Sequence, residues 1–259
     1  MKNLLPLLLL LSIITGCGKS VKVPNVTQDS HTDPLTHWSN VLKTYVNNKG
    51  EIDFHGLSHN PKDLHAFVNY ISRISPESDP SQFPTKEAMI AYYINSYNAL
   101  SMYNIIDSGI PKSLSGYRKI IFFFFRKLTI GGKKQSLYAY ENDIIRAQGE
   151  ERVHFALNCM SVSCPRLPQT PFTADNLNDE LNREARRFFA ESRNLQVDHE
   201  KKVLRLSEIL KFYKKDFLTK SHFLIAYANK FVKEKIPEDY NVTFIDYDWT
   251  VNDQYRHQN

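Results

Sequence analysis

The sequence predicts a helix-rich α+β fold: a single domain with a small, mainly antiparallel sheet. Apolar residues recur at helical spacing in several separate stretches, and short strand-like runs lie between them. No regular alternation of strand, helix and strand is present, which argues against a parallel α/β sheet. The chain has 259 residues, 42% of them hydrophobic, enough for one large domain with a buried core.

The N-terminus resembles a bacterial lipoprotein signal peptide. Lys2 provides a positive start, and Leu4–Ile14 form an apolar stretch too short to span a bilayer of about 30 Å. The following Ile14-Thr15-Gly16-Cys17 has the form of a lipobox, in which the cysteine thiol receives the lipid. An ordinary secretory signal cut nearby is the alternative.

The lipoprotein interpretation divides the chain into three parts. We expect residues 1–16 to be the signal peptide, residues 17–34 to be a lipidated N-terminus and polar tether, and residues 35–255 to form the domain. The expected location is the bacterial cell envelope, because several acyl chains anchor a protein stably. Gly18 rather than Asp follows Cys17, which by the sorting rule of Gram-negative cells indicates the outer membrane, facing the periplasm.

The first half of the domain is predicted to be mostly helical. Trp38 to Val46 show helical spacing, a second helix begins near Pro61, and residues 86–107 are apolar nearly all round, as in a buried central helix. Glu51–Phe54 alternate like a short strand. A loop rich in Ser and Pro spans residues 75–84.

The middle of the chain is predicted to supply strands. Ile120–Phe125 are continuously apolar and favour a buried strand, with a membrane-dipping loop as the alternative because basic residues follow. Thr129–Lys134, with two glycines, predict a hairpin. Ser136 is a candidate cap for a helix that runs to Arg146, and Val153–Cys159 look like another strand.

The last third mixes both types. Thr173 is predicted to cap a helix through Phe189, and residues 195–198 are expected to pair with 203–206. Two helices are expected around 208–218 and 221–235, followed by extended segments at 242–245 and 247–252.

The densest cluster of reactive side chains lies at 154–165. It contains His154, Cys159, Cys164 and two hydroxyls within twelve residues. A thiolate activated by a nearby base could act as a nucleophile. If the segment is a regular strand, His154 and Cys159 point to opposite faces, so their contact would need a bulge or an early turn.

Three other interpretations of this cluster stay open. Cys159 and Cys164 could form a disulfide in an oxidising compartment. Either thiol could be a small buried apolar group, with His154 satisfied in the core. Cys-x₄-Cys with one histidine offers too few ligands for a convincing metal site, so no metal is expected.

Two further groups could complete a site. Asn95 and Asn98 share one face of the central helix, where a buried amide without partners costs roughly 1–3 kcal/mol. They could orient a catalytic histidine, as an asparagine does in thiol proteases, or tie the helix to loop backbone. Glu141 could pair with Arg146, face a cleft or lie on a solvated helix face.

Several functions are disfavoured by what the sequence lacks. The net charge of +5 is spread along the chain and does not indicate nucleic-acid binding. No Gly-rich phosphate loop, Gly-x-Ser-x-Gly, His-Glu-x-x-His or Cys-x-x-Cys motif is present, and no cofactor is indicated. The membrane, through the lipid anchor, is the one partner that the sequence indicates.

Several motifs together resemble domain of unknown function family 547. They are distributed from about Trp38 to Asn252, and they are Tyr93–Leu100, Gly131-Gly132, Leu137, Glu141–Arg146, His154–Cys159, Ser161, Ser163–Pro165, Tyr247–Trp249 and Asn252. Bacterial members of this family are often exported proteins or lipoproteins, and plant members tend to have Ser where Cys164 stands. The resemblance therefore implies Cys159 as the family-wide functional thiol and weakens an obligatory disulfide.

Two functions follow as hypotheses. The first is an envelope lipoprotein with a thiol-dependent hydrolase- or transferase-like site, in which Cys159 is the nucleophile, His154 the base, and Asn95 or Asn98 the orienting or oxyanion group. Papain- and transglutaminase-like enzymes place the histidine after the cysteine, which would point to His199 or His222 instead. The rival is a non-catalytic binding or scaffold lipoprotein with structural cysteines.

Overall fold

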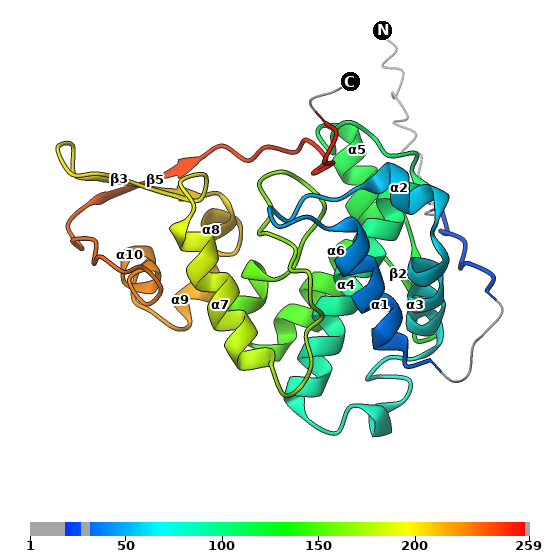
Figure 1. Cartoon of the computed structure of the whole chain (residues 1–259). Helices are drawn as coiled ribbons and strands as arrows, with labels where there is room; N and C mark the ends of the chain where they lie inside the picture. Colours follow the sequence, from blue (N-terminus) through cyan, green and yellow to red (C-terminus); the bar gives the residue numbers. More distant parts are fainter. Residues whose placement is uncertain (1–18, 27–31, 257–259) are drawn as a thin grey trace, which may run out of the picture.

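The computed structural model describes residues 19–26 and 32–256 (Figure 1). The predicted signal peptide and the lipobox cysteine, Cys17, lie outside the described residues. Within these two ranges, no helix is both long and apolar enough to cross a membrane.

The fold is α+β and helix-rich, as predicted, but its strands form two small sheets. β1 (Leu128–Ile130) and β2 (Lys133–Gln135) make an antiparallel hairpin. In the second sheet, β4 (Val203–Ser207) lies between β3 (Leu195–Asp198), which is antiparallel to it, and β5 (Asn241–Ile245), which is parallel.

The helices differ greatly in length, from one turn to six. The α-helices are α1 (Pro34–Tyr45), α2 (Phe54–His59), α3 (Lys62–Arg73), α4 (Lys86–Asp107), α5 (Tyr117–Ile120), α6 (Leu137–Ala139), α7 (Leu177–Ala190), α8 (Ile209–Phe212), α9 (Lys214–Leu218) and α10 (Leu224–Ala228). The 3₁₀ and π-helical segments are η1 (Pro80–Gln82), η2 (Ile121–Phe125), η3 (Tyr140–Ile145), η4 (Arg146–Gln148) and η5 (Glu151–Phe155).

The helix α4 runs through the centre of the larger core. Thr85 caps its start by accepting a hydrogen bond from the Ala88 amide at 3.1 Å. Every side chain from Ile90 to Ile105 is buried, as the predicted all-round apolar pattern requires. Around it, α1 and α3 pack against each other through the stacked rings of Trp38 and Phe67, whose centroids are 5.7 Å apart.

A second apolar cluster forms around α7, β4 and the short helices α8 to α10. Its centre is Phe155, whose ring lies 4.8 Å from that of Phe188 and 5.5 Å from that of Phe217. The preceding Val153 belongs to the larger core. η5 therefore joins the two clusters, and residues just after it lie where they meet.

Two predicted strands are helical, and a third is reduced to single bridges. Ile120–Phe125 continue α5 as the π-helical turn η2, and Val153–Cys159 contain η5 followed by irregular backbone. Glu51–Phe54 provide only isolated bridges at Ile52 before α2 begins. Short apolar runs fit either a strand or a helix, and here tertiary contacts decide.

Other boundaries also shift. The helix α7 begins at Leu177, because Thr173 and Asn176 bond each other's backbone amides in the preceding turn. In the region predicted as a tether, the Val21 amide donates to the Lys127 carbonyl at 2.8 Å and the Val21 side chain is buried. Residues around Val21 therefore lie against the domain.

Candidate functional site

A pocket of about 330 Å³ opens where the two apolar clusters meet. Its walls are largely aromatic, and its polar groups include both thiols, a histidine, a glutamate and an arginine. The residues that line it are Tyr97, Lys119, Phe123, Phe124, Tyr138, Glu141, Asn142, Arg146, His154, Leu157, Cys159, Cys164, Pro165, Ile209, Phe212, Tyr213, Tyr247 and Trp249.

The two cysteines are free thiols in direct contact. The sulfur atoms of Cys159 and Cys164 are 2.7 Å apart, and the Cys159 amide donates to the Cys164 sulfur at 3.1 Å. The Tyr247 hydroxyl is 3.0 Å from the Cys164 sulfur and 3.5 Å from the Cys159 sulfur. Cys164 is buried and Cys159 is half-buried.

These contacts distinguish the two thiols. Burial by itself would raise the pKa of Cys164, but hydrogen bonds from the Cys159 thiol, the Tyr247 hydroxyl and the amides of Ser161 and Cys159 lower that pKa to about 7. Burial and the neighbouring Cys164 raise the pKa of Cys159 well above its usual value. These hydrogen bonds favour the thiolate at Cys164, and the prediction that Cys159 is the nucleophile stays a prediction.

The loop that carries the thiols is held by amide side chains. Asn98 on α4 donates to the Ala156 carbonyl at 2.9 Å and accepts from the Asn158 amide at 2.7 Å. Asn158 in turn accepts from the Met160 amide at 2.6 Å and donates to the Pro165 carbonyl at 2.7 Å. Met160 has a positive φ of 70°, so the chain turns sharply between the cysteines.

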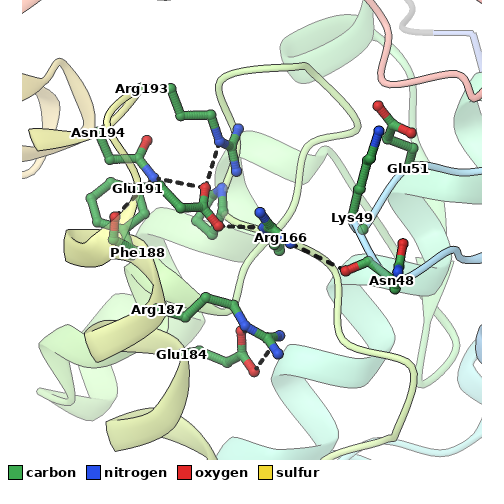
Figure 2. A network of polar contacts seen from close by, with 12 residues as sticks. Asn48, Lys49, Glu51, Arg166, Glu184, Arg187, Phe188, Glu191, Arg193 and Asn194 are labelled. Carbon is green, nitrogen blue, oxygen red and sulfur yellow. Dashed lines mark hydrogen bonds and ion pairs between the residues drawn. The ribbon is translucent and has the colours of Figure 1, made fainter.

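A second set of contacts holds the far side of this loop, and Figure 2 shows the side chains of Arg193, Glu191 and Arg166 that belong to it. Arg193 donates to the carbonyls of Val162 and Cys164, the latter at 3.1 Å. Glu191, at the end of α7, pairs with both Arg193 and Arg166. The loop is thus fixed to α4 on one side and α7 on the other, and the position of Cys164 depends on both helices.

His154 is held by a carboxylate and not by a thiol. Its Nε2 is 2.8 Å from an Asp216 oxygen, and Arg146 binds both oxygens of Asp216 at 2.7 and 2.8 Å. Burial would raise the pKa of Asp216, but the bonds from Arg146 and His154 hold that pKa well below its usual range. No described residue bonds His154 Nδ1, and the imidazole lines the pocket although its side chain is only 1% exposed.

Tyr213 connects the histidine to the other polar groups. Its ring stacks on His154 with a centroid distance of 3.8 Å. Burial and the nearby Glu141 raise the pKa of Tyr213, and the two thiols add to this shift. Glu141 also accepts a hydrogen bond from Tyr97 at 2.9 Å, so the carboxylate is buried among phenols and is not paired with Arg146.

The predicted site residues thus separate into two groups. Cys159, Cys164, His154 and Glu141 line one pocket, although His154 is not hydrogen-bonded to either thiol. Asn95 does not line it: its amide bonds only the Phe172 backbone, donating at 2.7 Å and accepting at 3.1 Å. Asn98 does not line it either, and the structure gives both asparagines the role of tying α4 to loop backbone.

Sequence reasoning missed three contributors to the site. Asp216, Tyr213 and Arg193 reach it from segments far along the chain, and none lies in a recognisable motif. Tyr247 and Trp249 were part of the family resemblance and do line the pocket. His199 bonds Tyr240 and does not line this pocket, nor does His222. Among the described residues, no group of three or more His, Cys, Asp or Glu could hold a metal ion.

Comparison with known proteins supports the resemblance over part of the chain. Residues 80–189 match a family model described as protein of unknown function, DUF547. The chain resembles DUF547. The matched range contains α4, Glu141, His154 and both cysteines, whereas Asp216, Tyr213 and Tyr247 lie beyond it. No curated protein and no solved structure matches the chain.

Proposed function

We propose that this protein is a lipid-anchored enzyme of the bacterial cell envelope with a thiol-dependent hydrolase- or transferase-like site. The observation that carries the proposal is one pocket holding a thiol of lowered pKa, Cys164, together with a histidine oriented by Asp216. A nucleophilic thiolate and an oriented base are the two groups that acyl transfer by cysteine enzymes needs.

The geometry assigns different tasks to these groups. The hydrogen bonds to the Cys164 sulfur favour the thiolate and so ease transfer of its proton to a base. Its sulfur attacks a carbonyl carbon, a thioester forms, and the leaving group departs with the electron pair of the broken bond. His154 Nδ1 takes the proton of the Cys164 thiol and gives it to the leaving group. In the second step it takes a proton from the attacking water, the thioester C–S bond breaks, and the Cys164 thiolate is released.

The aromatic walls suit a substrate with an apolar part. Tyr138, Phe212 and Trp249 lie on the same pocket as the thiols, and aromatic side chains provide large apolar contact area. Lys119 also lines it and can pair with an anionic group on the substrate, whereas Arg146 is already bound to both oxygens of Asp216. The substrate class we favour is therefore an acyl compound that combines an apolar portion with a negative charge.

The test is trapping of the acyl-enzyme with p-nitrophenyl acetate. We expect p-nitrophenolate release and one acetyl group on Cys164, located by peptide mass spectrometry. Cys164→Ser should remove the adduct, whereas the matched variant Cys159→Ser should keep it. Asp216→Asn should slow deacylation, because the imidazole loses its orienting partner.

A second candidate is a non-catalytic binding lipoprotein with structural cysteines. The contact of 2.7 Å between the two sulfur atoms favours it, because an oxidising compartment could join them. A Cys159–Cys164 bridge in protein isolated without reductant, with no acetyl adduct after reduction, would replace the enzyme proposal with this one.

The lipid anchor is a separate part of the proposal and rests on Ile14–Cys17. Cells that express the protein should incorporate labelled palmitate into it, and the protein should enter the detergent phase. Cys17→Ala should abolish both. Labelling that persists in this variant would contradict lipidation at Cys17.

A further inference from the structure

The segment from Tyr117 to Phe125 presents an apolar face to solvent. Tyr117, Ile120, Ile121, Phe124 and Phe125 are between 41% and 68% exposed. They follow one another at the spacing of a single helix face, and the intervening Phe122 and Phe123 are buried. Helix α5 and turn η2 therefore have two apolar sides. One side packs against the domain, and the other is exposed to solvent.

This part of the chain carries most of the large exposed hydrophobic side chains among the described residues. Six of the nine large exposed hydrophobic side chains in the described part of the chain lie between Tyr117 and Tyr138. Phe124 and Tyr138 stack on each other with centroids 4.3 Å apart, so the patch extends from η2 onto α6. Isolated exposed apolar residues are ordinary, but a contiguous patch marks a contact surface.

The charged residues of the segment that carries the patch are all of one sign. From Ser108 to Tyr140 the chain contains no acidic residue and seven basic ones, which are Lys112, Arg118, Lys119, Arg126, Lys127, Lys133 and Lys134. Arg126 is paired with Asp107, whereas Lys112 and Arg118 are exposed. An apolar helix face flanked by Lys and Arg is the pattern of helices that lie in the headgroup region of anionic bilayers.

The N-terminal segment meets the domain at the same place. The Lys127 amide donates to the Lys19 carbonyl at 3.0 Å, and Ser20 forms a parallel bridge with Lys127, two residues after Phe125. Lys19 is only two residues beyond Cys17. In Figure 1, α5 lies at the upper edge of the domain, away from the β3–β5 sheet.

We propose that the face formed by Tyr117, Ile120, Ile121, Phe124 and Phe125 lies on the surface of an anionic phospholipid bilayer. The apolar side chains enter the headgroup region, and the flanking lysines and arginines pair with lipid phosphates. The proposal goes beyond the thiol site. It shares with the proposed function the lipid at Cys17, which would hold this face against the bilayer, and the side chain of Phe124, which also lines the pocket.

The test uses the mature chain with Cys17→Ala, so that lipidation plays no part. We expect it to float with vesicles of phosphatidylethanolamine and phosphatidylglycerol, and to bind phosphatidylcholine vesicles more weakly. Replacing Ile120, Ile121 and Phe125 by Ser should reduce binding at least about tenfold. The matched control is Phe223→Ser, which removes an exposed ring at the start of α10 and should leave binding unchanged.

Two further measurements keep the outcomes distinct. Lys112→Glu with Arg118→Glu should weaken binding to anionic vesicles while leaving the apolar face intact. Acetylation of Cys164 in the triple Ser variant should match that of the parent, which shows that the domain is folded and tests the thiol site separately. Equal vesicle binding by the parent and the triple variant would overturn the proposal. A parent that is dimeric and a triple variant that is monomeric would overturn it too, because the face would then bind a second copy.

Discussion

Asn98 and Cys164 are both buried, and Asn98 holds the loop that carries Cys164, yet their surroundings differ in kind. Both polar atoms of Asn98 are bonded to backbone, at 2.9 and 2.7 Å. Cys164 accepts hydrogen bonds that favour its charged form, and it lines a pocket. Asn98 therefore stabilises the fold, whereas Cys164 carries a reactive thiol that the stability of the fold does not require.

The same contrast separates Asn95 from His154. Asn95 uses its amide on the Phe172 backbone, while His154 uses only Nε2 on Asp216. A buried side chain whose polar atoms are all hydrogen-bonded has a structural role. A buried side chain that lines a pocket and keeps an atom without a hydrogen-bond partner is a candidate for function. Three substitutions test this comparison, and they run from the largest expected effect to the smallest.

The largest effect should come from Asn98→Leu. It leaves the Ala156 carbonyl and the Asn158 amide buried without partners, which should lower the free energy of unfolding by about 2–6 kcal/mol. Urea unfolding at neutral pH measures the change. Asn95→Leu strands two backbone groups in the same way and should cost a similar amount, whereas Cys159→Ser should cost less than either. Wild-type stability in both asparagine variants would contradict their structural role.

A smaller effect should come from Cys159→Ala. Loss of its thiol removes a hydrogen bond that lowers the pKa of Cys164, so that pKa should rise from about 7 toward or above the free value of about 8.5. A higher pKa means less thiolate at pH 7, and alkylation of Cys164 by iodoacetamide should slow about tenfold there. Rate profiles against pH, read by mass spectrometry, give the midpoint directly. A midpoint that does not move would show that Cys159 does not tune Cys164.

The smallest effect should come from Asp216→Asn, because Asp216 is partly exposed. The pKa of Asp216 is lowered in the folded protein, so its ionised form stabilises the fold above the unfolded value of about 4, and that stability is lost as the pH falls further. At pH 7 the variant should be less stable by about 1 kcal/mol. Urea titrations at decreasing pH should show this difference shrinking below about pH 4. Parallel curves at every pH would mean that Arg146 and His154 do not hold the carboxylate ionised.

The sequence predicted the parts of the fold whose patterns are long or local. The apolar pattern of residues 86–107 predicted α4 with its boundaries, and the two glycines predicted the β1–β2 hairpin. It failed where a short apolar run allowed two conformations. Ile120–Phe125 became the turn η2, because a helix buries Phe122 and Phe123 while leaving its opposite face exposed.

For the candidate site, the sequence determined the reactive groups and little of their pairing. Local composition was enough to select His154, Cys159 and Cys164, since thiols and an imidazole within a few residues are informative wherever the chain goes. The ionisation of the thiol pair depends in part on Tyr247, and the orientation of His154 depends on Asp216. Both partners are more than sixty residues away along the chain, at separations of 83 and 62. Hydrogen bonds and desolvation act through distances in space, so only the tertiary structure could decide the chemistry of groups that the sequence had already named.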